Sequence, residues 1–124
     1  MKVLLSIKPE FVEKIFDGTK KYEFRKSLFK RHDIKYVIIY ASAPVKRVVG
    51  EFEIDDILSD DVNIIWERTK DLSGITKTFY NSYFQRRKTA NAIQIGHLTK
   101  YEIPKTLSDY NILQAPQSFC YILD

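Results

Sequence analysis

Residues 17–25 read DGTKKYEFR and join an expected helix to an expected strand. Upstream of this stretch, Pro9 suits the first position of a helix, and apolar residues recur at helical spacing. We therefore predict a helix over residues 9–17. Gly18 ends it, because glycine adopts at little cost the left-handed conformation that closes a helix C-terminus.

A strand is expected directly after this helix, over residues 20–26, because residue types alternate there. Lys20 lies at the junction, where strand alternation does not yet decide its direction. A charged strand face most often only meets solvent, since exposed Glu–Arg pairs contribute little to stability. The alternative is a functional site, with one carboxylate among several cations. The strand is predicted to place Tyr22 and Phe24 on one face and Lys21, Glu23 and Arg25 on the other.

The rest of the chain predicts further strands around a helical segment. Residues 36–42 are apolar on both faces, which is typical of a central or helix-covered strand. In residues 47–57 apolar and acidic residues alternate, and Gly50 lies at a plausible bulge. Two helices are expected, one capped at residues 59–61 and running to Leu72, the next carrying the stripe Ile75, Phe79 and Tyr83. The other predicted elements are strands over residues 3–7, 92–101 and 119–123 and a loop or short helix over residues 104–110.

Composition indicates one globular domain without a membrane span. The chain has 124 residues, of which 44% are hydrophobic and 29% charged. This length suffices for one core, and no apolar run reaches the ~18 residues of a membrane span. The first eight residues are predicted to be a strand rather than a signal peptide. Cys120 is the single cysteine and is expected as a buried thiol. Together these features predict a cytoplasmic protein.

Charge is distributed unevenly along the chain. Residues 1–50 carry twelve Lys and Arg against five Asp and Glu, whereas residues 51–72 carry two against eight. The net charge is +4, and residues 86–88 add a second basic cluster. One cationic face is therefore expected, and such faces commonly bind phosphate groups.

The spacing Gly18-x-Lys20-x-x-Glu23-x-Arg25 resembles the G-x-K-x-x-E-x-R signature of the ASCH domain family. Flanking segments around residues 5–9, 40–52 and 116–121 resemble the same family, so the likeness covers most of the chain. It implies a single ASCH domain over residues 1–124. It also implies an α+β fold of the PUA-like type, a small and partly open β-barrel with an N-terminal helix and a two-helix insertion.

The resemblance implies a ligand cleft lined by Lys20, Glu23 and Arg25. The expected ligand is RNA or a nucleotide-like molecule, and DNA is a further possible ligand. The role that the resemblance implies is in transcription or translation regulation. A tyrosine such as Tyr22, Tyr40 or Tyr83 can stack on a base if it lines the cleft. The flanking resemblance adds four further candidate ligand-binding residues, namely Lys8, Ser42, Gln117 and Ser118.

A hydrolase is the first alternative function. If Lys20 is desolvated beside Arg25, its pKa falls, and it can act as base or nucleophile with Glu23 shuttling the proton. In the family, one branch hydrolyses N4-acetylcytidine through the signature lysine, and some members are ribonucleases. That branch has threonine where this chain has Glu23, which argues against the amidohydrolase. This alternative requires burial of Lys20.

A helix-turn-helix over residues 60–89 is the second alternative, for a DNA-binding transcription regulator. Its second helix offers Lys77, Asn81, Gln85 and Arg86 for groove contact. The acidic first helix suits DNA poorly, and the stripe of Ile75, Phe79 and Tyr83 favours packing of both helices on the core. We predict packing.

Metal and cofactor sites are not expected. His32 and His97 are far apart in sequence and lack clustered cysteine or carboxylate ligands. With four glycines in the chain, a glycine-rich phosphate loop is also absent from the sequence.

Overall fold

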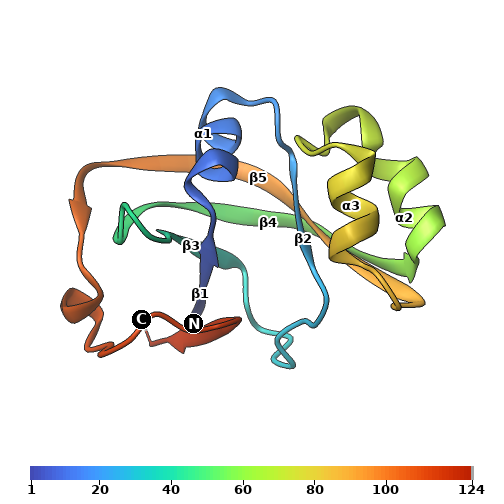
Figure 1. Cartoon of the computed structure of the whole chain (residues 1–124). Helices are drawn as coiled ribbons and strands as arrows, with labels where there is room; N and C mark the ends of the chain where they lie inside the picture. The colour runs from blue at the N-terminus through green and yellow to red at the C-terminus, as the bar shows by residue number, and fades with distance from the viewer. Residues whose placement is uncertain (124) are drawn as a thin grey trace.

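One mixed sheet of six strands organises the protein in this computed structural model, which describes residues 1–123 (Figure 1). The strands pair in the order β2-β5-β4-β3-β1-β6, with β1 and β3 parallel and the other pairs antiparallel. The strands are β1 (Lys2–Ile7), β2 (Tyr22–Arg25), β3 (Tyr36–Ala41), β4 (Arg47–Asp61), β5 (Thr89–Lys105) and β6 (Phe119–Ile122). The helices are α1 (Pro9–Asp17), α2 (Val62–Thr69) and α3 (Lys77–Tyr83), with short 3-10 helices η1 (Lys70–Leu72) and η2 (Leu107–Tyr110).

The α+β class is confirmed by the mixed sheet and its helices. The expected small, partly open β-barrel is wrong, because the sheet does not close. The two edge strands, β2 and β6, are four residues each and stand at opposite ends of the strand order. Closure would need a backbone ladder between them. A side chain spans this gap instead, because Arg25 on β2 donates hydrogen bonds to Ser118, just before β6.

Helix α1 begins and ends as its sequence predicts. Pro9 occupies the first helical turn, and Gly18 closes the helix in the left-handed conformation with φ of 87°. The backbone N–H of Gly18 donates a hydrogen bond of 3.2 Å to the Ile15 carbonyl oxygen. Val12 and Ile15 are buried against the sheet, and the next residues of the chain turn directly into the functional segment.

Strand β3 is central and covered on both faces, as its two apolar faces predict. On one face Val37 and Ile39 pack in the core cluster that includes α1. On the other face Ile38 and Tyr40 pack in a separate cluster, against residues around η2 and β6. Cys120 belongs to this second side and is half-buried rather than fully buried.

Strands β4 and β5 are longer than predicted. Strand β4 runs on through residues 59–61, because Asp61 pairs with Thr89 in the β4–β5 ladder, and the predicted cap lies at the last of these residues. The Asp61 carboxylate then caps α2 by accepting a hydrogen bond from the Asn63 backbone N–H. The ladder shifts register beside Gly50, which confirms the predicted irregularity there.

The two inserted helices pack on the sheet, as predicted. Ile65 of α2 and Tyr80 of α3 are fully buried in one cluster with Phe24 of β2. The predicted core stripe is wrong in part, since Ile75, Phe79 and Tyr83 are only half-buried and line a cleft. Within the described chain, no helix has the length and apolar character needed to cross a membrane.

Candidate functional site

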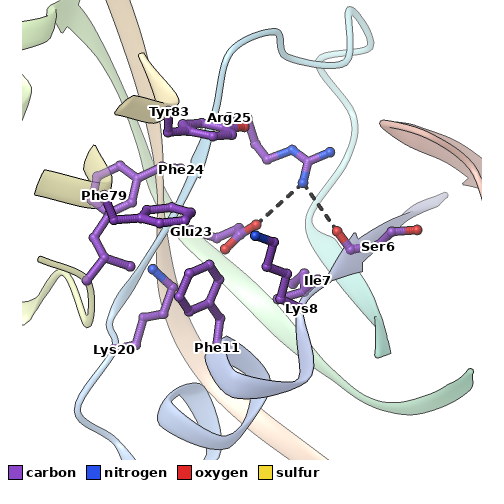
Figure 2. Close-up of a pocket in the computed structure, with 11 residues that line it drawn as sticks. Ser6, Ile7, Lys8, Phe11, Lys20, Glu23, Phe24, Arg25, Phe79 and Tyr83 are labelled. Carbon is purple, nitrogen blue, oxygen red and sulfur yellow. Dashed lines mark hydrogen bonds and ion pairs between the residues drawn. The ribbon is translucent and has the colours of Figure 1, made fainter. Parts of the chain in front are cut away.

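A cleft of about 280 Å³ lies where the end of β1, helix α1, strand β2 and helix α3 meet (Figure 2). The segment between α1 and β2 brings Lys20 to it, and β2 itself contributes Glu23 and Arg25. Residues 23 and 25 share one face of the strand, as alternation predicts, but Phe24 also lines the cleft and Lys21 does not. Lys20, Glu23 and Arg25, which are close in sequence, thus line one cavity.

Lys20 brings a buried amine to the cleft. The residue is 1% exposed, and its Nζ donates a hydrogen bond of 2.8 Å to the Ser73 carbonyl oxygen. The same nitrogen lies over two aromatic rings, 5.2 Å from the centroid of Phe11 and 4.9 Å from that of Phe24. Burial disfavours the charged form and lowers the pKa of Lys20 to about 8, although the Glu23 carboxylate opposes this shift. Lys20 therefore changes its protonation state near pH 8.

Glu23 is a buried carboxylate between two cations. Burial raises its pKa, while Lys20 and Arg25 lower it. Its Oε2 lies 3.4 Å from Nη1 of Arg25, and both side chains are nearly covered. Burial has the largest effect, so the pKa of Glu23 lies above its ordinary value, and the guanidinium of Arg25 is the nearest partner for its charged form.

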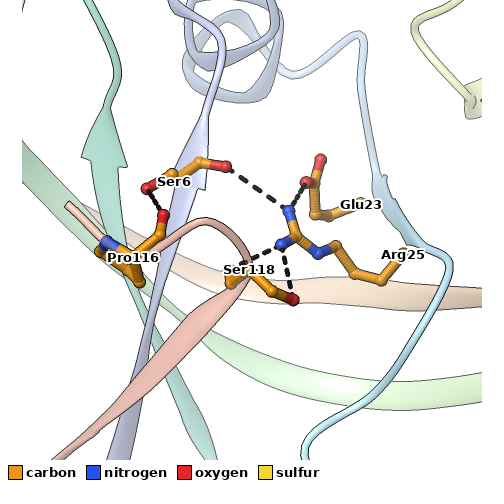
Figure 3. Close-up of polar contacts among 5 residues, drawn as sticks. All are labelled: Ser6, Glu23, Arg25, Pro116 and Ser118. Atoms are coloured by element: carbon orange, nitrogen blue, oxygen red, sulfur yellow. Dashed lines mark hydrogen bonds and ion pairs between the residues drawn. The ribbon is translucent and has the colours of Figure 1, made fainter.

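Arg25 ties three segments together (Figure 3). Its Nη2 donates a hydrogen bond of 2.7 Å to the Ser118 carbonyl oxygen and a longer one, of 3.5 Å, to the Ser118 hydroxyl. Its Nη1 donates to the Ser6 carbonyl oxygen and to Glu23, each at 3.4 Å. Ser6 in turn donates from Oγ to the Pro116 carbonyl oxygen at 2.9 Å. The guanidinium thus positions Glu23 and fixes the chain before β6.

Helix α3 supplies an aromatic wall, defined by Phe79 and Tyr83. Their rings are nearly parallel, at 11° and 6.2 Å between centroids. A lysine ammonium lies over each ring, Lys8 at 5.2 Å from the Phe79 centroid and Lys26 at 4.8 Å from that of Tyr83. Cations beside aromatic faces are a typical surface for a stacked base and its phosphate.

The model of the ASCH domain family matches residues 5–99, a range that contains all four signature positions. The chain belongs to the ASCH domain family. Of the four signature positions, Lys20, Glu23 and Arg25 line the cleft described above.

Relatives in the ASCH family include proteins from Zymomonas mobilis. An ASCH domain-containing ribonuclease from this organism is 33% identical over 89 residues, covering 72% of this chain and 60% of that protein. The crystal structure of ASCH from Zymomonas mobilis superposes with a TM-score of 0.89 at 28% identity, covering 99% of this chain and 88% of that one.

Longer proteins also contain a similar segment. The large ribosomal subunit protein uL22 of Ureaplasma parvum is 28% identical over 120 residues, which cover 97% of this chain and 39% of that protein. The ATP synthase subunit alpha of the same organism is 31% identical over 121 residues, or 97% of this chain and 15% of that protein. The chain therefore spans less than two-fifths of the length of these two relatives.

The structure gathers some of the predicted ASCH site residues and separates others. Lys8 lines the cleft, and Ser118 lies behind it as a partner of Arg25. Ser42 lies in the turn after β3 and Gln117 is exposed before β6, and neither lines the cleft. Their roles in binding stay predictions. Of the three candidate stacking tyrosines, Tyr83 lines the cleft, whereas Tyr40 is buried on the other side of the sheet.

Sequence reasoning missed the cleft residues Phe11 and Phe79. The spacing of Ile75, Phe79 and Tyr83 predicts one helix face, but it does not reveal whether that face meets the core or a cavity. Over residues 1–123 no group of three or more His, Cys, Asp or Glu side chains is arranged to hold a metal ion.

Proposed function

We propose that this ASCH domain is a ribonuclease that takes a single-stranded RNA segment into the cleft and cleaves it beside Lys20. The burial of the Lys20 amine carries the proposal, because a lysine with a pKa near 8 is a far better general base near neutral pH than an exposed one. The similarity to an ASCH domain-containing ribonuclease supports RNA as the substrate. The competing reading is a module that binds RNA without cleaving it, in transcription or translation regulation.

Lys20 acts as the base in the proposed reaction. Its neutral amine takes the proton of a ribose 2′-hydroxyl, and the resulting oxygen attacks the adjacent phosphorus. The bond from phosphorus to the 5′ oxygen of the next nucleotide breaks, and the proton returns from Lys20 to that leaving oxygen. The products are a 2′,3′-cyclic phosphate and a 5′-hydroxyl. The negative charge of Glu23 favours the protonated form of Lys20, so it stabilises the ammonium that forms during the step.

The size of the cleft favours one unstacked nucleotide as its occupant. At about 280 Å³ it lies at the lower limit of typical small-molecule sites. A base inside it has Phe79 and Tyr83 on one side and the cations Lys8 and Lys26 at their rings. Duplex RNA keeps its bases stacked and paired, so we expect single-stranded regions to be preferred.

The test is incubation of the protein with a short single-stranded RNA, with product identified by mass spectrometry. A second RNA carries one 2′-deoxy nucleotide, and N4-acetylcytidine is incubated in parallel. We expect fragments that end in a 2′,3′-cyclic phosphate, with no cleavage at the deoxy position. The exposed Lys46 provides the control variant Lys46→Ala, which should cleave as the wild type does.

Other results would replace the proposal. Cleavage at the deoxy position rules out attack by the 2′-hydroxyl. Retention of RNA on a filter without cleavage identifies a binding module, and deacetylation of N4-acetylcytidine identifies the amidohydrolase. Binding of duplex DNA through Lys77, Asn81, Gln85 and Arg86 would support the helix-turn-helix reading; all four are exposed, but α3 has only seven residues.

The pH dependence of cleavage follows from the protonation state of Lys20. Since its pKa is lowered to about 8, the amine is mostly protonated at pH 7 and mostly neutral at pH 9. If the neutral form is the base, kcat/KM should rise about tenfold per pH unit below 8 and level off above it. A rate that falls through pH 8 would instead mean that the ammonium form is needed, as a phosphate ligand. The profile is measured from pH 6 to 9.5 with one RNA substrate.

Tyr83→Leu is expected to weaken RNA binding by about 5- to 150-fold, the range that loss of one stacked base implies. Tyr36→Leu is the matched control, because Tyr36 also has a lysine over its ring, Lys2 at 5.2 Å, but lies away from the cleft. Affinity is measured by fluorescence anisotropy of labelled RNA at fixed salt. Equal losses in both variants would show that stacking in the cleft does not contribute.

A further inference from the structure

Residues 72–74, at the end of η1 and just after it, hold helix α1 and the signature segment through three successive backbone carbonyls. The Leu72 oxygen accepts a hydrogen bond of 2.8 Å from the Lys21 backbone N–H. The Ser73 oxygen accepts one of 2.8 Å from Nζ of Lys20, and the Gly74 oxygen accepts one of 3.1 Å from Nζ of Lys14. Residues some fifty positions downstream thus contact the signature segment at Lys20 and Lys21 and helix α1 at Lys14.

Gly74 lets this turn approach Lys20 closely. A Cβ atom on Gly74 would lie 2.5 Å from Cβ and 2.7 Å from Cγ of Lys20, and 3.1 Å from its Cα. The glycine also has a φ of 68°, in the left-handed region that side chains disfavour. Any larger residue here must therefore push the turn and Lys20 apart.

Ser73 makes the turn rigid. It is 1% exposed, and its hydroxyl donates to the carbonyl oxygens of Lys70 and Ile75, at 3.2 and 3.1 Å, as alternative partners. The same oxygen accepts from the Ile75 backbone N–H at 3.3 Å. This hydroxyl stabilises the backbone whose carbonyl group faces the Lys20 amine.

We infer that the Leu72–Gly74 turn is a positioning element that directs the lone pair of the Lys20 amine into the cleft. A neutral amine has two N–H groups and one lone pair. With one N–H bonded to the Ser73 oxygen and the rings of Phe11 and Phe24 beside the nitrogen, the rotation of the amine is restricted. The inference rests on the proposed role of Lys20 as a base, but the contacts of the turn do not depend on it.

The charged groups around Lys20 come from two other elements. Glu23 of β2 raises the pKa of Lys20, and Lys14 of α1 lowers it, while Lys8 and Arg25 also line the cleft. Lys14 is itself bonded to the turn, so the turn holds both this cation and Lys20 in place. Displacement of the turn should expose the Lys20 amine to water and move its pKa back towards 10.5, the ordinary value of a lysine.

The test is an NMR titration of the Lys20 side chain in the full chain, made on lysine-labelled protein in which the Lys20→Met variant assigns the signal. In Gly74→Ala we expect the pKa of Lys20 to rise by about one unit or more, and kcat for RNA cleavage to fall with the midpoint of its pH profile moved equally. Gly18→Ala is the matched control, because Gly18 also has a positive φ, of 87°, but a Cβ there meets no atom closer than 4.0 Å. Its Lys20 titration should match that of the wild type.

Ser73→Ala is a gentler second variant. It keeps the carbonyl group that binds Lys20 but loses the hydroxyl contacts that stabilise the turn, so a smaller rise of the Lys20 pKa is expected. An unchanged Lys20 titration in folded Gly74→Ala or Ser73→Ala protein overturns the inference. An absence of RNA cleavage by the wild type would overturn the proposed function alone, since the NMR titration reads the position of Lys20 without any substrate.

Discussion

Replacement of Lys20 by methionine is expected to reduce RNA cleavage by about 10²- to 10⁴-fold, the usual contribution of a general base. The protein should stay folded, because methionine fills a similar volume and its sulfur suits the neighbouring rings of Phe11 and Phe24. Loss of activity with retained structure is the result that a catalytic lysine predicts. It is measured as kcat/KM on one RNA substrate, with circular dichroism to verify the fold.

The same variant should differ from the wild type in how its stability depends on pH. The pKa of Lys20 is about 8 in the folded protein and near 10.5 when the chain is unfolded. Between these values the unfolded chain binds more protons, so the stability of the wild type rises with pH. The gain relative to Lys20→Met should reach ~3 kcal/mol from pH 8 to 10.5. Below pH 8 the cost of burying the ammonium is fully present.

Lys21→Met is the control for this measurement. Lys21 is the next residue along the chain, its side chain is exposed, and it does not line the cleft. Its stability should follow that of the wild type at every pH. If Lys20→Met also runs parallel to the wild type from pH 8 to 10.5, Lys20 is not desolvated, and the case for it as a base fails.

Local sequence was sufficient to predict the segment that carries the site. Pro9 and Gly18 define the ends of α1, and strand alternation places Glu23 and Arg25 on one face, because these features depend only on neighbouring residues. Neighbouring residues alone do not predict whether Lys20 is buried or exposed. Its burial depends on Ser73 and Gly74, which are distant in sequence and reach it only through the packing of the inserted helices.

The same limit explains the errors in the fold. The stripe of Ile75, Phe79 and Tyr83 has the spacing of any amphipathic helix face, and only the position of α3 on the sheet makes it the wall of a cleft. Likewise, β4 continues to Asp61 because β5 offers it a partner at Thr89. Long-range pairing thus extends the strand up to Asp61, the residue that also caps α2.

Arg25→Ala is expected to lower the free energy of unfolding by about 3–5 kcal/mol, the usual cost of removing one partner of a buried ion pair. The change leaves the buried Glu23 carboxylate without its cation and the carbonyl oxygens of Ser6 and Ser118 without their donor. The contact between β2 and the chain before β6 is lost as well. Weaker RNA binding than in Lys46→Ala is also expected, and the stability measurement shows how much of it comes from a disturbed fold.

Arg31→Ala is the matched control, because Arg31 also pairs with a carboxylate, Asp33 at 2.7 Å, but on the exposed surface. Such a pair contributes little, so urea denaturation should give nearly the wild-type stability. Adding Glu23→Gln to Arg25→Ala should recover part of the loss, since a neutral amide no longer needs the guanidinium. If Arg25→Ala is as stable as Arg31→Ala, the guanidinium does not support the fold. Its effect on RNA affinity would then report a direct contact with the ligand, as the sequence first suggested.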